Sequence, residues 1–332
     1  MHQTGLTRAR SMGPVVEALE RAGASPQRVF RRAGLPFGLV EQPDQLIPLR
    51  DQLTLVAIAT KELDEATLPL RLSRAGGIES LGAFGQRVLR ASTLATSICA
   101  CNENIQLMLQ TMTRMSLTRS GREARWSYEL TATIEVGRQE NELLAFGYMA
   151  DFLDRYASCD LIRAELPTAP AEKSRLEEAL GCDVRIGEKA CLVFPSEFLA
   201  TEGSYRPLEE PDGQDLLPIP ENLEALVENL IKLGLLDANP CVSWVSRRLG
   251  VSARTLQRSL SAAGATFENI RKRVLLDRAI LLLEGSSIPI TEIAHQLGYS
   301  DGAHFTRALS RWTGRSPTAW RRKTKVGHSA AS

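Results

Sequence analysis

The last quarter of the chain contains one short pattern twice. Residues 245–260 read VSRRLGVSARTLQRSL, and residues 293–309 read IAHQLGYSDGAHFTRAL. The Leu-Gly pair recurs after 48 residues and the later Arg after 49, so the second copy has one extra residue after its turn. Each copy combines a short helix with apolar periodicity, a turn at Gly, a Ser and a second helix that carries Arg. This order predicts a helix-turn-helix, whose second helix enters the major groove of DNA.

The first helix-turn-helix is predicted over residues 242–263. Ser252 follows the turn and is expected to cap the second helix by accepting a hydrogen bond from a free backbone N–H. Leu256 and Leu260 take the inward face of that helix. Arginine can bind guanine, and glutamine can bind adenine, through two hydrogen bonds each. Contacts with phosphates or water are the alternative. The candidate base-reading residues are Arg254, Gln257 and Arg258.

The second helix-turn-helix is predicted over residues 290–313, with Asp301 as a candidate cap. Its groove-facing positions are Gly302, Ala303, Thr306 and Arg307. Glycine and alanine have almost no hydrogen-bonding capacity, although an alanine can meet a thymine methyl group. We therefore expect an unequal division of labour. The first unit supplies most of the polar base readout, and the second anchors the protein, reads DNA shape or faces RNA polymerase.

A long helix over residues 267–284 is predicted to join the two units. Its 18 residues span about 27 Å, close to the roughly 34 Å between successive major-groove faces of B-DNA. The helix would thus hold both units on one face of the duplex. Four basic residues on it are candidates for contacts with the DNA backbone, although such charges are commonly only solvated; they are Arg271, Lys272, Arg273 and Arg278.

The charge of the chain is unevenly distributed. Residues 241–325 contain 15 Lys and Arg against 5 Asp and Glu, a net charge of +10. The remainder has a net charge of −9, so the overall value of +1 hides the asymmetry. A basic block attached to an acidic body indicates a polyanionic partner for that block.

The first 200 residues mix helical and strand periods, which predicts an α+β domain with a small sheet. Residues 115–118 and 124–130 flank a polar turn and predict a β-hairpin. Two further strands are expected within 161–166 and 191–194. The expected helices lie at about 14–22, 26–33, 49–63, 78–94, 102–115, 140–156 and 171–180.

Residues 206–220 read RPLEEPDGQDLLPIP and contain four prolines, one glycine and four acids. Such a segment cannot sustain a helix or a central strand, so it predicts a linker. The expected domains are therefore an α+β domain over 1–205 and an all-α domain over 221–325.

Several functional classes are disfavoured. No stretch approaches the roughly 20 apolar residues of a membrane span, and the N-terminus has no apolar core typical of a secretory signal, which favours a cytoplasmic protein. The six cysteines lack the paired spacing of zinc ligands. No nucleophile–base pair or phosphate loop is present either. We therefore expect no enzyme activity, no metal and no cofactor.

Residues 241–322 resemble the AraC/XylS-type DNA-binding domain. The resemblance rests on LGVS and LQRSL in the first copy, on ITEIAHQLGYSDGAHFTRALSRWTG in the second, and on SPTAWRR at 316–322. It implies seven helices with two helix-turn-helix units joined by a linker helix. It also implies a transcription regulator that contacts RNA polymerase at a promoter. Leu260 and Leu309 stand where the family usually has Phe, and both keep the apolar bulk.

The N-terminal region is similar to the arabinose-binding-like sensor found in part of this family. GASPQRVFRRAGLP and ALGCDVRIGEKACLVFPSEFL carry the likeness. It implies that the domain binds a small-molecule effector, forms a homodimer, or both, and that the protein activates a catabolic operon. Candidate pocket residues, for which core packing is the alternative, are Trp126, Tyr128, Phe146 and Tyr148.

Two other functions stay open at this point. The six cysteines leave room for a DNA-repair enzyme with a zinc site fused to an AraC-type domain. A DNA-binding protein with a purely architectural or dimerising body is the other alternative. Stabilisation by a metabolite would count against the architectural protein, because a ligand that binds only the folded state raises its stability.

Overall fold

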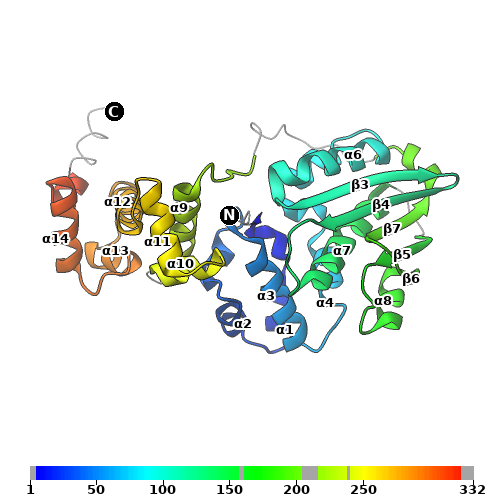
Figure 1. The fold of residues 1–332 in the computed structure, drawn as a ribbon, viewed down its shortest axis with the longest axis horizontal. Helices are drawn as coiled ribbons and strands as arrows, with labels where there is room; N and C mark the ends of the chain where they lie inside the picture. The colour runs from blue at the N-terminus through cyan, green and yellow to red at the C-terminus, as the bar shows by residue number, and fades with distance from the viewer. Residues whose placement is uncertain (1–4, 157–160, 204–215, 238–239, 323–332) are drawn as a thin grey trace. The chain divides into compact units, whose positions relative to one another are not determined.

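The computed structural model describes residues 5–156, 161–203, 216–237 and 240–322 (Figure 1). The chain forms two compact units, Met1–Ile219 and Pro220–Ser332. Residues 206–215 of the predicted linker and residues 323–325 of the predicted second domain lie outside the described residues. The last linker residues before the second unit, 216–219, belong to the first unit.

The first unit contains a five-stranded sheet in the order β3-β4-β7-β5-β6. The strands are β3 (Thr113–Ser120), β4 (Glu123–Leu130), β5 (Arg163–Leu166), β6 (Asp183–Ile186) and β7 (Ala190–Pro195). The predicted hairpin is confirmed, since β3 and β4 pair antiparallel from Thr113–Leu130 to Ser120–Glu123. Along β4 every second residue is buried, including Trp126 and Tyr128. Because successive side chains point to opposite faces of a strand, one face of β4 packs against the core.

The far edge of the sheet is a parallel pair. β5 and β6 run in the same direction, and α8 (Lys173–Leu180) connects them, as a crossover between parallel strands requires. A second, two-stranded sheet pairs β1 (Leu6–Arg8) with β2 (Leu46–Pro48). The sequence periods did not predict this small sheet.

Helices supply the rest of the first unit. α7 (Arg138–Tyr156) contacts both the sheet and α4 (Leu68–Gly76). At the α4–α7 crossing a methyl group on Gly147 would overlap the Ser73 hydroxyl and the Leu70 carbonyl, so glycine allows the close approach. The other α-helices are α1 (Val15–Arg21), α2 (Pro26–Ala33), α3 (Leu49–Glu62), α5 (Ala83–Leu89) and α6 (Leu94–Asn104).

Two of the predicted helices are wrong. The segment 102–115 is not one helix, because α6 ends at Asn104, a π-turn follows over Ile105–Leu109, and β3 begins at Thr113. Its apolar spacing reflects burial of successive short elements. The segment 78–94 divides into a 3₁₀ turn (Ile78–Leu81) and α5, separated by Gly82 with φ of 65°.

The second unit is all-helical. Its helices are α9 (Leu223–Gly234), α10 (Val242–Arg248), α11 (Ala253–Ala262), α12 (Phe267–Gly285), α13 (Ile290–Gln296) and α14 (Gly302–Thr313). Residues 317–322 are also helical, which gives seven helical segments over the described part of this unit. The predicted fold class, an α+β domain followed by two helix-turn-helix units joined by a linker helix, is confirmed. No helix among the described residues is long and apolar enough to cross a bilayer.

Candidate DNA interface and sensor cavity

The two second helices of the helix-turn-helix units are held by side-chain caps. Ser252 accepts a hydrogen bond of 3.1 Å from the Thr255 backbone N–H at the start of α11. Asp301 accepts one of 2.7 Å from the His304 backbone N–H at the start of α14. Both caps are as predicted. Such caps satisfy backbone donors that the first helical turn leaves free.

The outward face of α11 carries all three of its candidate residues. Leu256 and Leu260 are buried in the unit, and this fixes the rotation of the helix. Neither arginine of the candidate set takes part in an ion pair among the described residues. This face can therefore offer its donors to another molecule. Its exposed candidate residues are Arg254, Gln257 and Arg258.

The basic residues of α12 are arranged differently. Arg273 donates hydrogen bonds of 2.8 Å to both Glu224 and Glu228 of α9. Its guanidinium therefore already binds two carboxylates within the protein, so it is a poorer candidate for a contact with DNA phosphates. Lys272 and Arg278 are exposed on the same helix.

The outward face of α14 offers less hydrogen bonding. Ala303 and Arg307 are exposed, whereas Gly302 and Thr306 are half-buried. The Thr306 hydroxyl donates its proton to the Gly302 carbonyl over 2.7 Å, so towards another molecule it can only accept. A Cβ on Gly302 would lie 3.2 Å from a methyl group of Thr291. Gly302 thus permits close packing of α14 on α13, and Arg307 is the strongest donor of the four.

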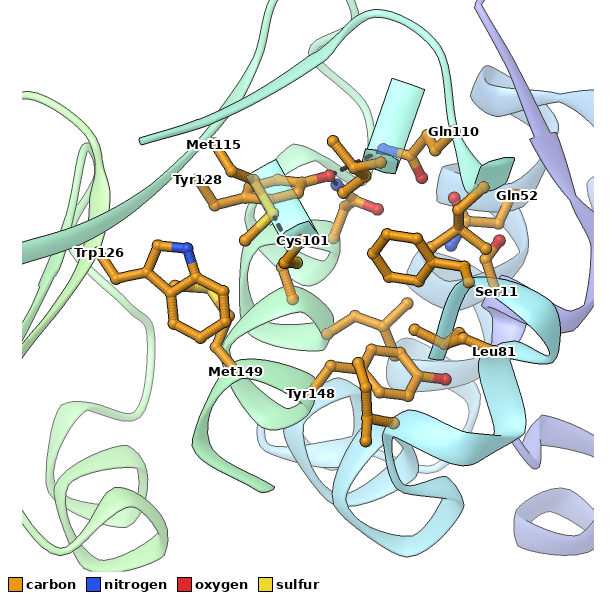
Figure 2. Close-up of a pocket in the computed structure, with 17 residues that line it drawn as sticks. Ser11, Gln52, Leu81, Cys101, Gln110, Met115, Trp126, Tyr128, Tyr148 and Met149 are labelled. Atoms are coloured by element: carbon orange, nitrogen blue, oxygen red, sulfur yellow. Dashed lines mark hydrogen bonds between the residues drawn. The ribbon is translucent and has the colours of Figure 1, made fainter. Parts of the chain in front are cut away.

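The first unit contains a partly open cavity of about 60 Å³ (Figure 2). Trp126, Tyr128 and Tyr148 line it, as the pocket prediction proposed. Phe146 is fully buried but is not among the lining residues, so it packs in the core. Other residues of the lining were not predicted from the sequence, and they come from 3₁₀ turns, helices and strands. Those with polar side chains are Ser11, Gln52, Gln110 and Asn141.

Most polar groups of the lining have hydrogen-bond partners within the protein. The Tyr128 hydroxyl accepts hydrogen bonds of 2.9 Å from Gln110 and 2.7 Å from Asn141. Ser11 donates to the Arg8 carbonyl over 2.8 Å. Burial raises the pKa of Tyr148 to about 12, so its hydroxyl stays protonated at neutral pH. No charged side chain is found among the lining residues.

Two of these groups are exceptions. The Tyr148 hydroxyl has no hydrogen-bond partner among the described residues. The other exception is Gln52. It lies on α3 with 1% of its surface exposed, and neither its amide nitrogen nor its amide oxygen has a hydrogen-bond partner among the described residues. In Figure 2 it lies with Ser11 at one end of the lining, and Trp126 lies at the other. Buried polar groups are nearly always hydrogen-bonded, so an unpaired amide at a cavity wall is unusual.

The end of the linker is attached next to this cavity. The Leu217 backbone N–H donates to the Leu107 carbonyl over 2.6 Å. The buried Arg8 side chain donates to the carbonyls of Met108, at 2.8 Å, and Leu216, at 3.1 Å. Leu107 and Met108 belong to the π-turn whose Ile105 lines the cavity. One short turn therefore contacts both the cavity and the chain that leads to the second unit.

The five cysteines within the described residues are free thiols. Burial raises the pKa of the Cys101 thiol to about 12, and this thiol contacts the Met115 sulfur at 3.7 Å. Cys99 is exposed. Over the part of the chain that the structure describes, no group of three or more His, Cys, Asp or Glu side chains could hold a metal ion. Cys159 lies outside the described residues.

Two family models match the chain. The arabinose-binding domain of AraC transcription regulators matches residues 23–202, more than half of the chain, and a helix-turn-helix domain matches residues 245–323. The chain belongs to the AraC family of transcription regulators. The AraC-family assignment makes it a DNA-binding regulator and not an enzyme, which removes the repair-enzyme alternative.

Several known proteins are similar to this chain over most of its length. The HTH-type transcriptional regulator VirS of Mycobacterium tuberculosis is 27% identical, over 97% of this chain and 98% of its own length. The ornithine utilization regulator of Pseudomonas aeruginosa is 24% identical, over 92% and 94%. A solved structure, the transcriptional regulator CdpR from P. aeruginosa, matches 93% of this chain and 96% of its own, with a TM-score of 0.45 and 19% identity.

Proposed function

We propose that this AraC-family protein is an effector-responsive activator of a catabolic operon. In this proposal residues 1–205 sense the effector and dimerise, 206–220 link the domains, and 221–325 bind promoter DNA. The first DNA-binding unit reads bases through Arg254, Gln257 and Arg258. The second engages the neighbouring groove through Gly302, Ala303, Thr306 and Arg307.

The base-reading part rests on the exposure of unpaired donors on capped helices. A recognition helix needs a rigid frame and side chains that are free to reach base edges. α11 meets both conditions, because Ser252 caps it and its arginines make no ion pair among the described residues. α12 has 19 residues, spans about 28 Å and lies between α11 and α14 in the sequence.

The effector-responsive part rests on the π-turn beside the cavity. An effector must alter something that the DNA-binding unit can sense, because a ligand shifts an equilibrium only through different interactions with its two states. The turn that contributes Ile105 to the cavity also holds Leu217 by a backbone hydrogen bond. Movement of this turn on ligand binding would release or tighten the end of the linker.

Activation of catabolic genes is supported by the names of relatives. One relative is an ornithine utilization regulator, and the transcriptional activator RhrA of Rhizobium meliloti is 26% identical over 105 residues. An activator at a promoter would contact RNA polymerase, and the family resemblance favours a homodimer. We also propose that the protein acts in the cytoplasm.

The test is footprinting of the full chain on the DNA beside its own gene, with and without metabolites of the neighbouring operon. We expect a footprint covering two successive major grooves, and at least one metabolite that changes its affinity or extent. A matched fragment, residues 220–332, should bind the same site and ignore every metabolite. If the full chain binds but no metabolite alters it or stabilises the protein, the architectural alternative holds. Failure of both to bind DNA at low salt would refute the DNA-reading assignment.

A further inference from the structure

The cavity has a definite chemical character. Its lining is mainly apolar, and the polar groups that it contains are uncharged. A charged ligand buried there would lose its hydration without gaining an opposite charge, which is strongly unfavourable. The lining therefore selects against free carboxylates, ammonium groups and zwitterionic amino acids.

The unpaired amide of Gln52 sets the polar requirement. A primary amide offers donors at its nitrogen and an acceptor at its oxygen. Most other polar groups at the wall already bind protein atoms, as with the Tyr128 hydroxyl and its two amide donors, whereas the Tyr148 hydroxyl is also without a partner among the described residues. A ligand that carries both a donor and an acceptor would satisfy Gln52 without breaking these existing bonds.

The size of the cavity limits the ligand further. One water needs about 10–15 Å³ on the scale of such cavity volumes, so a cavity of about 60 Å³ holds only a few small groups. Met115 and Met149 are part of the wall. Methionine side chains are unbranched and adapt their shape, so the wall can yield to a short chain.

We propose that this cavity takes a small uncharged molecule with an apolar body and one amide or hydroxyl end, and that this end pairs with Gln52. The inference rests on the proposed effector role of the first unit and names the ligand class. The proposal excludes charged amino acids as effectors of this protein. It therefore distinguishes the protein from a regulator that would respond to ornithine, the compound in the name of one relative.

The experiment is thermal unfolding of the full-length protein with four probes: pentanamide, 1-pentanol, pentanoate and L-ornithine. The two neutral probes should raise the unfolding temperature of the first unit, because a ligand of the folded state stabilises it. Pentanoate and ornithine should leave it unchanged. Larger stabilisation by a charged probe, or none by either neutral probe, overturns the proposal.

Variants of Gln52 test the polar contact. Gln52→Leu and Gln52→Met should each weaken the apparent affinity for pentanamide about tenfold, as expected for a lost hydrogen-bonded pair. Both should unfold at a higher temperature than the wild type without a probe, since they remove a buried unpaired amide. Gln86→Leu, at an exposed position of α5, is the matched control and should change neither. Unchanged affinity in both Gln52 variants overturns the proposal.

Promoter binding separates this proposal from the broader effector function. If neutral probes bind at Gln52 but alter neither promoter affinity nor transcription, the ligand class stands and the effector role fails. If a charged probe binds and alters promoter affinity, the effector role stands and the ligand class fails.

Discussion

The two units use their polar side chains in opposite ways. In the first unit arginines are held by carboxylates of the same unit, as when Arg163 binds both Glu123 and Glu165 at 2.9 Å. The Gln52 amide, which has no hydrogen-bond partner among the described residues, faces a cavity. In the second unit Arg254 and Arg258 face outwards without an ion pair among the described residues. The candidate ligand-binding group of the first unit is therefore buried, whereas the candidate DNA-binding groups of the second unit are exposed on its surface.

This difference separates stability from binding. A substitution at the cavity wall removes packed atoms and should change the unfolding free energy of the first unit. A substitution on the outer face of α11 removes no packed atoms, and it should change DNA affinity alone. The predictions below test that separation.

The largest effect is expected for Trp126→Ala. Trp126 is 1% exposed, and its indole N–H donates to the Asn102 side chain over 3.0 Å. Removing this side chain leaves a void and should cost about 3–5 kcal/mol of unfolding free energy. Calorimetry of the full chain should show a lower transition for the first unit only. DNA affinity, measured below that transition, should stay within twofold of the wild type; a lower melting temperature of the second unit would contradict the separation.

Arg258→Ala should have the converse effect. Loss of a base-contacting guanidinium is expected to weaken specific DNA binding by about 1–3 kcal/mol and to relax preference at one or two bases. The unfolding free energy should change by less than about 0.5 kcal/mol, as for other surface substitutions. Affinity should be measured on a panel of single-base operator variants. Arg273→Ala is the control, because Arg273 binds Glu224 and Glu228 and should not affect base preference.

Glu142→Gln tests the buried charge of the first unit. Burial raises the pKa of the Glu142 carboxyl to about 7, against the smaller opposing effect of Arg138. Its pKa is lower in the unfolded chain, so the wild type should lose about 1–3 kcal/mol of stability as the pH rises from 5 to 8. The glutamine variant should lack this loss and be the more stable protein at pH 8. Urea unfolding at several pH values measures the slope, with exposed Glu135→Gln as control.

The sequence could predict the candidate DNA-binding residues of the second unit because each proposed binding surface lies on a single helix. Gln257 and Arg258 follow Arg254 by three and four residues, which places both beside Arg254 on one side of any helix that the capped pattern forms. The fold class followed from the same periodicity and from the doubled motif. Three of the named aromatic residues, Trp126, Tyr128 and Tyr148, line the cavity; the first two lie at alternating positions of β4, whose side chains on that face point inwards.

The rest of the cavity could not be predicted in this way. Ser11, Gln52 and Gln110 reach it from separate elements that only tertiary packing brings together. Gln52 lies on an apolar helix, where a polar residue in the sequence indicates a solvent-facing position. The π-turn Ile105–Leu109 was hidden for a related reason, since its apolar spacing continues the period of α6.

The smallest effect is expected for Thr306→Val, which tests the unequal roles of the two recognition helices. The Thr306 hydroxyl donates to the Gly302 carbonyl, so the DNA loses only an acceptor, and valine keeps the branched shape. We expect less than about 0.5 kcal/mol of lost affinity, whereas Gln257→Ala on α11 should cost about 1–3 kcal/mol. Both variants should be measured on the same operator at the same salt concentration, because phosphate contacts make affinity depend on salt. If Thr306→Val proves the more damaging of the two, α14 reads bases through Thr306 and the first helix-turn-helix is not the principal reader.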